Sequence, residues 1–193
     1  MIPSPHIQKI VITGPESTGK STLCRQLANH YNTLWVPEFA REFLMKTGNK
    51  YSYDDLLTIA RGQLSLEDEY LQSLIHKTGK KKSDQGELPS ILFIDTDMYV
   101  MKVWCEFAFG KCHPWILEQI AKREYDYYLL CNIDLPWIQD ELREYPMLET
   151  RQELFKIYKD LLENQLTPWS LISGNDKERL NNAVSVIDNY FIC

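Results

Sequence analysis

The chain has 193 residues, of which 44% are hydrophobic and 25% are charged, which is typical of a globular domain and excludes disordered and fibrous classes. Its 27 acidic and 21 basic residues give a net charge of −6, so no overall positive field attracts nucleic acid or anionic lipid. No apolar run approaches the roughly 20 residues that span a bilayer, and no signal peptide is recognisable, so we expect one cytoplasmic domain over residues 1–193 without membrane or nucleic-acid partners.

The chain opens with a predicted strand, a glycine loop and a helix. Residues 7–13 form a β-branched apolar run that ends at a glycine, as a buried strand does. Apolar residues at helical spacing begin after Lys20. The elements predicted next are a strand over 33–36, helices over 38–46 and 54–75, and an exposed, mobile, lysine-rich loop at about 77–89.

The second half of the chain alternates strands with helices. The predicted elements are a strand over 90–94, a helix from about Met98, a strand over 127–131, a polar lid over about 137–151, a helix over 150–166, a strand over 169–172 and a helix over 176–190. Strands that alternate with helices predict an α/β fold of three layers, in which a parallel five-stranded sheet is covered on both faces. Ligands then bind at the carboxyl ends of the strands.

The strongest motif lies between the first strand and the first helix. Residues 14–21 read Gly-Pro-Glu-Ser-Thr-Gly-Lys-Ser and match the phosphate-loop pattern G-x-x-x-x-G-K-[ST]. In such a loop backbone amides surround the phosphates, Lys20 reaches the β- and γ-phosphates, and the Ser21 hydroxyl binds magnesium. We therefore predict a P-loop NTPase fold with ATP and Mg²⁺ as cofactors. The residues predicted to bind the nucleotide are Gly14, Glu16, Ser17, Thr18, Gly19, Lys20, Ser21 and Thr22.

Other patterns narrow the class of nucleotide-binding protein. No aspartate precedes a glycine by three residues, and the fourth strand ends Asn132-Ile133-Asp134 without the lysine of a guanine reader, which argues against a GTPase switch. A mechanical ATPase usually carries adjacent Asp and Glu after its magnesium-binding strand, whereas the third strand here ends Ile94-Asp95-Thr96-Asp97. These patterns favour a small-molecule kinase, which needs a carboxylate for the acceptor hydroxyl and cations for the moving phosphoryl group.

Three carboxylates follow predicted strands. Glu38 lies about one helical turn before Arg41, so the pair suits a catalytic base with an orienting arginine, although a glutamate at a helix start also complements the helix dipole. Asp95 and Asp97 follow the third strand, where one carboxylate can hold magnesium and the other can hold the acceptor. The alternative is that one of these aspartates caps the helix from Met98.

The remaining candidates are arginines of the lid and aromatic residues. Arg143 and Arg151 lie in or beside the polar segment where related kinases keep a closing lid, although arginines on charged helices are often only solvated. The aromatic residues Tyr99, Trp104, Phe107 and Phe109 are dense enough to bind a planar base, or to form core. The catalytic set is thus Lys20, Glu38, Asp97, Arg143 and Arg151, the substrate set is Glu38, Arg41, Asp97, Tyr99 and Trp104, and the metal set is Ser21 and Asp95.

Five blocks of sequence carry a resemblance to a known family. They are Gly14-Pro-Glu-Ser-Thr-Gly-Lys-Ser21, Glu38-Phe-Ala-Arg-Glu-Phe43, Phe93-Ile-Asp-Thr-Asp97, Gly110-Lys-Cys-His-Pro114 and Trp137-Ile-Gln-Asp-Glu-Leu-Arg143. Together they are similar to the ribosylnicotinamide kinase domain of the NadR family, and they occur in family order over residues 10 to about 165.

The resemblance implies an adenylate-kinase-like P-loop fold. It also implies transfer of the ATP γ-phosphoryl group to the 5′-hydroxyl of ribosylnicotinamide, a small-molecule nucleoside, which gives nicotinamide mononucleotide for NAD salvage. No His-x-Gly-His motif of an adenylyltransferase occurs in the chain, so we expect a stand-alone kinase. The alternatives are a kinase for another nucleoside or nucleotide, and a non-enzymatic ATP-binding module. The sequence makes no prediction of the oligomeric state.

Overall fold

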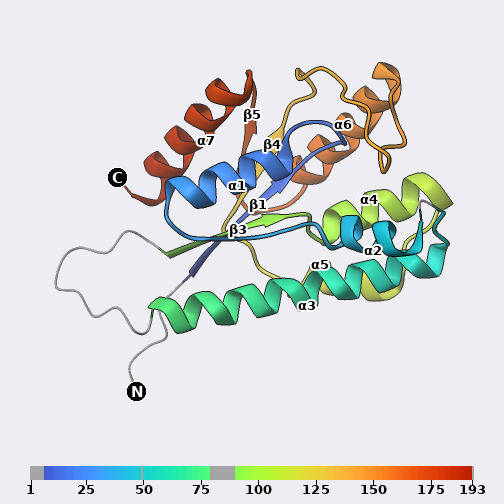
Figure 1. Cartoon of the computed structure of the whole chain (residues 1–193), viewed down its shortest axis with the longest axis horizontal. Helices are drawn as coiled ribbons and strands as arrows, with labels where there is room; N and C mark the ends of the chain where they lie inside the picture. Colours follow the sequence, from blue (N-terminus) through green and yellow to red (C-terminus); the bar gives the residue numbers. More distant parts are fainter. Residues whose placement is uncertain (1–6, 49, 79–89, 193) are drawn as a thin grey trace.

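Five parallel strands form one sheet at the centre of the computed structural model, which describes residues 7–48, 50–78 and 90–192 (Figure 1). The strands are β1 (Ile7–Thr13), β2 (Leu34–Val36), β3 (Ser90–Asp95), β4 (Tyr127–Cys131) and β5 (Trp169–Ile172). Their order across the sheet is β2-β3-β1-β4-β5, and every neighbouring pair is parallel. The order reverses beside β1, the point at which parallel sheets bind ligands.

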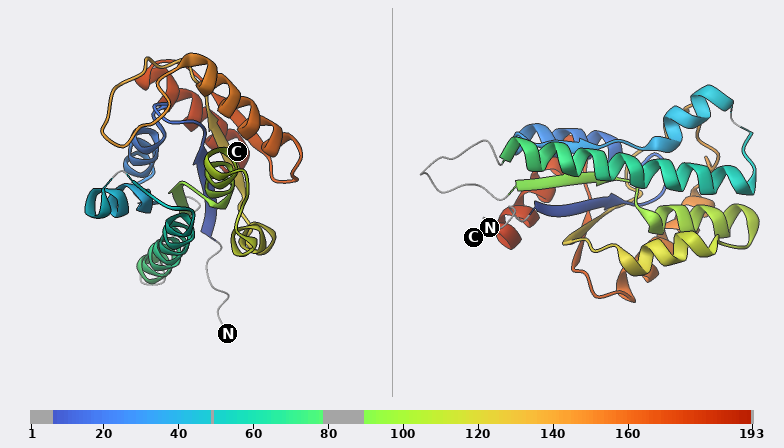
Figure 2. Two further views of the ribbon diagram at one scale, coloured as in Figure 1. Left: turned by 90° about the vertical axis from the view of Figure 1, so that its right-hand side faces the viewer. Right: turned by 90° about the horizontal axis from the view of Figure 1, so that it is seen from below.

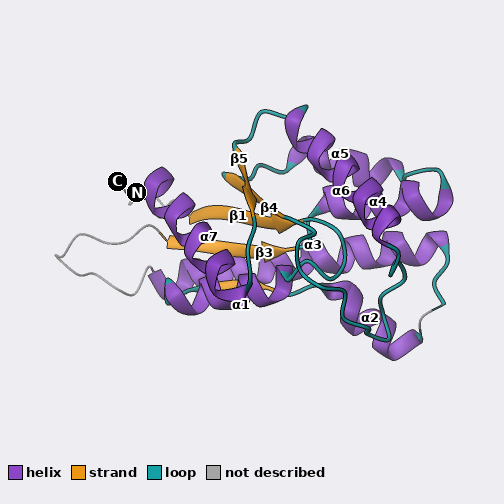
Figure 3. Ribbon diagram, turned by 90° about the horizontal axis from the view of Figure 1, so that it is seen from above, coloured by secondary structure: helices purple, strands orange, loops and turns teal. Residues whose placement is uncertain are grey.

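Helices cover both faces of this sheet (Figure 3). The helices of the described residues are α1 (Lys20–His30), α2 (Phe39–Thr47), α3 (Tyr53–Thr78), α4 (Met98–Phe109), α5 (Pro114–Lys122), α6 (Leu148–Glu163) and α7 (Asp176–Phe191). Residues of α1 and α7 pack on one face of the sheet, and residues of α3, α4 and α6 pack on the other. The sheet is therefore the middle of three layers.

Alternate residues of each strand enter opposite cores. In β1, Ile10 and Ile12 join the core beneath α1 and α7, whereas Val11 between them joins the other core, and all three are fully buried. In β4, Leu129 and Leu130 divide in the same way. Burial of both faces explains why these strands do not alternate strictly between apolar and polar residues: residues 127–131 form an apolar run, and the polar Gln8 and Lys9 lie only near the start of β1.

A third apolar cluster joins α2, α3, α4 and α5. It contains Ala40, Ile59, Met101 and Ile116, each 3% exposed or less. Figure 2 shows that α3 extends along the molecule beyond the strand ends, where α2 and α4 lie next to it. The cluster therefore builds a wall beside the carboxyl edge of the sheet.

The structure confirms the predicted α/β P-loop fold with a five-stranded parallel sheet. Sequence periodicity did not predict α5, which is short and begins at Pro114. It placed the end of α3 three residues too early, and it shifted α6 by two to three residues toward the C-terminus. Of the loop predicted at about 77–89, residues 77 and 78 belong to α3 instead, and the remainder lies outside the described residues. In the described chain, no helix combines the length and the apolar character needed to cross a membrane.

Candidate functional site

A cavity of about 550 Å³ lies at the carboxyl edge of the sheet. Its walls come from the phosphate loop, the starts of α1 and α2, one side of α4, the segment before α6, and α6 itself. All eight residues predicted to bind the nucleotide line it. The other lining residues include Arg25, Glu38, Arg41, Val103, Trp104, Phe107, Asp140, Arg143, Glu144, Tyr145 and Tyr158.

The phosphate loop depends on glycine at both ends. Gly14 has a φ of +133°, and a Cβ atom at this position would lie 2.9 Å from the carbonyl oxygen of Cys131. Gly19 has a φ of +79° and precedes the first residue of α1. Within the loop, the carbonyl oxygen of Pro15 accepts hydrogen bonds from Thr18 Oγ1 at 2.8 Å and Lys20 Nζ at 2.9 Å. The loop is thus a preformed turn whose amides precede a helix N-terminus, an arrangement that suits an anion.

Asp95, at the end of β3, is the most unusual carboxylate of the site. It is fully buried, and neither of its carboxylate oxygens has a hydrogen-bond partner among the described residues. Burial and the nearby charge of Glu38 raise the pKa of Asp95, while Lys20 and the hydroxyl of Ser21 act in the opposite direction. A buried carboxylate without donors is costly unless a cation compensates it. Asp95 and Ser21 supply the oxygen ligands that Mg²⁺ prefers, so this donor set fits the metal.

Glu38 occupies the position just before α2 and is half-buried. It is the N-cap residue of the helix, yet its side chain makes no capping hydrogen bond, so its carboxylate is not used to satisfy the helix start. Arg41, one turn later, pairs with Asp140 at 2.8 Å instead of with Glu38. The structure therefore brings Glu38 and Arg41 to one cavity but links the arginine to the segment before α6.

The segment over residues 137–147, hereafter the strap, rests on the phosphate loop. The Ile138 N–H donates to Ser17 Oγ at 3.1 Å, and the Glu144 N–H donates to Glu16 Oε2 at 3.0 Å. Burial raises the pKa of Glu16, and this backbone donor partly offsets the effect. The residues predicted as a lid thus lie against the loop through two side chains of the motif itself.

Two arginines lie close to one indole ring. The guanidinium carbons of Arg143 and Arg151 are 5.9 Å and 5.6 Å from the ring centroid of Trp137. Arg143 donates to Ser17 Oγ at 3.3 Å and to the carbonyl oxygen of Ile138. Arg143 lines the main cavity, whereas Arg151 is not among the residues that line it.

Arg151 is buried, and none of the ion pairs among the described residues includes it. It is 4% exposed, its Nε has no hydrogen-bond partner among the described residues, and its Nη2 donates to the carbonyl oxygen of Leu135 at 3.4 Å. Burial and the charge of Arg143 lower the pKa of Arg151, while the charge of Glu16 acts in the opposite direction. Two adjacent cations beside a phosphate loop form an environment that an anion would stabilise.

Aromatic side chains line the end of the cavity near α4 and α6. Trp104, Phe107, Tyr145 and Tyr158 all contribute. Trp104 Nε1 donates to the hydroxyl of Tyr51 at 2.8 Å. The tyrosine hydroxyl in turn donates to Glu144 of the strap at 2.7 Å, so the orientation of the indole is coupled to the strap. Trp104, named from the sequence as a substrate residue, is therefore in the cavity.

Asp97 and Tyr99 lie elsewhere. Asp97 Oδ1 accepts the Val100 N–H at 3.2 Å, and Oδ2 accepts the Tyr128 hydroxyl at 3.0 Å, so the capping alternative is confirmed for Asp97. Burial raises the pKa of Asp97 to about 6. Asp97 and Tyr99 both line a second cavity of about 320 Å³, which also includes Arg123. The structure does not bring these two predicted residues to the phosphate-loop cavity.

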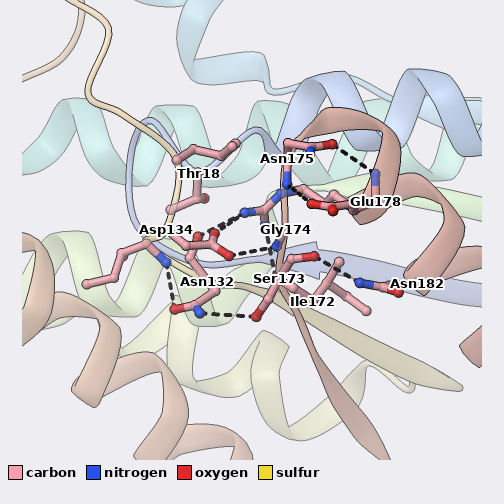
Figure 4. Close-up of polar contacts among 12 residues, drawn as sticks. Thr18, Asn132, Asp134, Ile172, Ser173, Gly174, Asn175, Glu178 and Asn182 are labelled. Carbon is pink, nitrogen blue, oxygen red and sulfur yellow. Dashed lines mark hydrogen bonds and ion pairs between the residues drawn. The ribbon is translucent and has the colours of Figure 1, made fainter.

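Behind the phosphate loop, hydrogen bonds join the residues that follow β4 and β5 (Figure 4). Arg179 of α7 is 2% exposed and donates to the carbonyl oxygens of Ile172 at 3.0 Å and Asn132 at 3.4 Å. It also pairs with Asp134, whose second oxygen accepts the Gly174 N–H at 2.7 Å. Arg179 therefore satisfies the carbonyl groups at the ends of two strands.

This corner supports the loop directly. A Cβ atom at Gly19 would lie 3.0 Å from Leu135 Cδ1 and 4.0 Å from Arg179 Cδ. The phosphate loop thus packs close to Arg179, whose hydrogen bonds join the ends of β4 and β5. Sequence reasoning did not identify Arg179, because a lone arginine in an amphipathic helix has no local pattern that distinguishes a buried residue from a solvated one.

Three comparisons place the chain among known proteins. A family model described as an AAA domain matches residues 9–179. The chain is 28% identical over 161 residues to the trifunctional NAD biosynthesis/regulator protein NadR of Escherichia coli (strain K12), a match that covers 81% of this chain and 36% of that protein. It therefore spans about a third of the length of this curated relative.

Solved structures share the fold. A crystal structure of NadR protein in complex with NR has a TM-score of 0.74 and 23% identity, and covers 95% of this chain and 49% of that chain. A thymidylate kinase from Ehrlichia chaffeensis has a TM-score of 0.65 and 13% identity, and covers 95% of this chain and 99% of that chain. The resemblance predicted from the sequence blocks is confirmed.

Proposed function

Because the chain belongs to the family of AAA domains and is homologous to the kinase region of NadR, we propose that it phosphorylates ribosylnicotinamide with ATP. The product would be nicotinamide mononucleotide, formed when the γ-phosphoryl group passes to the 5′-hydroxyl of the nucleoside. The solved NadR structure in complex with NR supports this choice of acceptor by analogy.

One observation carries the proposal. A single cavity of about 550 Å³ joins the phosphate loop to the aromatic group of Trp104, Phe107, Tyr145 and Tyr158. A triphosphate at the loop and a planar ring among the aromatics would then lie in one enclosed space, which is what phosphoryl transfer between two bound substrates requires.

In this proposal the phosphate loop and two cations bind the triphosphate. The amides of residues 16–21 and Lys20 hold the phosphate oxygens. Ser21 and Asp95 hold Mg²⁺, which, when bound, neutralises charge on the β- and γ-phosphates. Arg143 and Arg151 stabilise the charge that develops on the transferred group and on the departing ADP.

We assign the proton acceptor to Glu38 in preference to Asp97. Glu38 lines the cavity and its carboxylate makes no capping bond, whereas both oxygens of Asp97 are engaged by Val100 and Tyr128. As the 5′-oxygen forms its bond to Pγ, the bond from Pγ to the β,γ-bridging oxygen breaks. The proton of the 5′-hydroxyl passes to the carboxylate of Glu38, and ADP leaves.

The acceptor is tested with a panel of nucleosides. Purified protein with ATP and Mg²⁺ should phosphorylate ribosylnicotinamide with a kcat/KM at least tenfold above that for uridine, thymidine or adenosine, measured by chromatography of the products. A preference for one of the standard nucleosides would favour the alternative kinase. Binding of ATP in calorimetry without any phosphorylated product would favour the ATP-binding module.

Replacing Glu38 by glutamine should lower kcat by roughly a hundredfold, in the range expected for loss of a general base. The amide keeps the size of the side chain but accepts no proton, so the dissociation constant for ATP should change by less than threefold. Steady-state kinetics and calorimetry measure the two quantities. As a control, Glu42→Gln alters an exposed glutamate of the same helix that pairs with Lys46, and should leave kcat unchanged. An undiminished kcat in Glu38→Gln would contradict the assignment.

A further inference from the structure

Gln63 is a polar residue inside the apolar contact of α2 with α3. It is fully buried at the middle of α3, on the same buried stripe as Ile59 and Leu64. A buried primary amide must find hydrogen-bond partners, since burying it unpaired costs on the order of 1–3 kcal/mol. An aliphatic residue would fill this packing position at no such cost.

Both hydrogen bonds of the amide go to the backbone on either side of Glu38. Gln63 Oε1 accepts the Phe39 N–H at 2.7 Å, and Gln63 Nε2 donates to the carbonyl oxygen of Pro37 at 3.3 Å. The side chain thus spans the peptide groups that enter and leave Glu38. It holds the turn between β2 and α2 from a helix that lies 24 residues further along the chain.

One of these bonds satisfies a donor at the start of α2. The first N–H groups of a helix have no partner within it, and the N-cap side chain normally accepts one of them. Glu38 is the N-cap residue of α2 but makes no such bond. Gln63 supplies an acceptor to the first residue of α2, and Glu38, whose carboxylate makes no capping bond, lines the cavity.

The neighbouring glycine brings the two helices close enough for this contact. A Cβ atom at Gly62 would lie 2.2–2.5 Å from ring carbons of Phe39, so any other residue would displace the ring. Phe39 therefore packs against the bare backbone of α3, next to the hydrogen bonds from Gln63. Two consecutive residues of α3 therefore hold the start of α2: Gly62 contacts the Phe39 ring, and Gln63 makes the hydrogen bonds to the backbone.

We infer that Gln63 is a positioning residue, which sets the place of the Glu38 carboxylate in the cavity by holding the backbone on both sides of it. The inference rests on the proposed function, because it assigns Gln63 to the same reaction. Gln63 touches no substrate in this account, and its effect on turnover passes entirely through Glu38.

Two substitutions remove the bonds in different ways. Gln63→Met keeps the volume and removes both hydrogen-bonding groups, while Gln63→Asn keeps the amide but shortens its reach by one methylene. Each should lower kcat about tenfold or more, because a misplaced catalytic group costs up to roughly a hundredfold, while the KM for ATP stays within twofold. Gln72→Met, on an exposed position of the same helix, is the matched control and should leave both constants unchanged.

A double-mutant cycle identifies the path of the effect. In a chain that already carries Glu38→Gln, the further change Gln63→Met should lower kcat by less than twofold, since the group that it positions is gone. A full tenfold loss in that background would overturn the inference, because Gln63 would then act by another route. Retention of wild-type kcat in both single variants at position 63 would overturn it as well.

Hydrogen exchange tests the same inference without turnover. The Phe39 amide should exchange at least tenfold faster in Gln63→Met than in the wild type, whereas amides of β1 should be unaffected. Unchanged protection of Phe39 would overturn the inference even in an active enzyme. If the wild type phosphorylates no nucleoside but the Phe39 amide exchanges faster in Gln63→Met as expected, the proposed function fails and the positioning of the Glu38 backbone stands.

Discussion

Replacing Lys20 by alanine is expected to lower the rate of phosphoryl transfer by roughly a thousandfold, because the phosphate loop then lacks the positive charge that binds the β- and γ-phosphates. The fold should survive. Lys20 Nζ donates to the carbonyl oxygen of Pro15, but the buried hydroxyl of Thr18 donates to the same oxygen at 2.8 Å and keeps the turn closed. Steady-state kinetics measures the loss, and circular dichroism with thermal melting checks the fold.

A second lysine controls for the removal of positive charge. Lys122→Ala alters a side chain that is 67% exposed and pairs with Glu118 on α5, so turnover should remain at the wild-type value. If Lys20→Ala kept even a tenth of the wild-type turnover with an intact fold, the loop would not bind the reacting phosphates. The assignment of this cavity to ATP would then be lost.

Replacing Arg151 by methionine is expected to lower turnover by about a thousandfold, the lower end of the effect of arginines on developing phosphate charge. In the same variant the melting temperature without nucleotide should equal or exceed that of the wild type. The guanidinium is 4% exposed, its Nε lacks a partner, and the neighbouring Arg143 repels it. Methionine keeps the apolar stem and removes an unbalanced buried charge. The substitution is therefore expected to stabilise the free protein while it slows the reaction.

Arg179→Met is the matched control, because Arg179 is as deeply buried as Arg151 but is paired. Its removal takes away the ion-pair partner of Asp134 and one donor to each of two strand-end carbonyl groups. We expect a loss of about 3 kcal/mol, within the range for breaking a buried ion pair, and a melting temperature roughly 6–12 °C lower. Thermal melts of both variants without ligand decide the matter. A clear destabilisation by Arg151→Met would contradict the view that the charge of Arg151 is stabilised only when an anion is bound.

The fold was predictable because its determinants are local. Each buried strand, such as 7–13 or 127–131, is a short apolar run that ends at a glycine or a polar residue, and each long helix has an apolar stripe. The helix α5 escaped prediction because it has nine residues and a single fully buried side chain, Ile116, which is too little periodicity to recognise. Its sequence signal was Pro114 at the first helical position.

The candidate site was predictable only in part. The phosphate loop is contiguous in sequence, so Lys20 and its neighbours could be named in full. Asp95 and Asp97 are equivalent in sequence, and only the hydrogen bonds from Val100 and Tyr128 distinguish the capping residue from the unpartnered one. Gln63 is beyond such reasoning, because its two bonds to the turn at Glu38 depend on how α3 packs against α2.

The contact of the strap with the loop restricts how this enzyme can be engineered. Glu16 and Ser17 occupy positions that the phosphate-loop motif leaves open, yet here they anchor Ile138 and Glu144. A loop grafted from another P-loop protein would conserve the glycines and the lysine while discarding both anchors. Insertion of one residue between the two anchored positions would have a similar result, since only one of them could stay in register. Loop and strap therefore have to be exchanged as a unit.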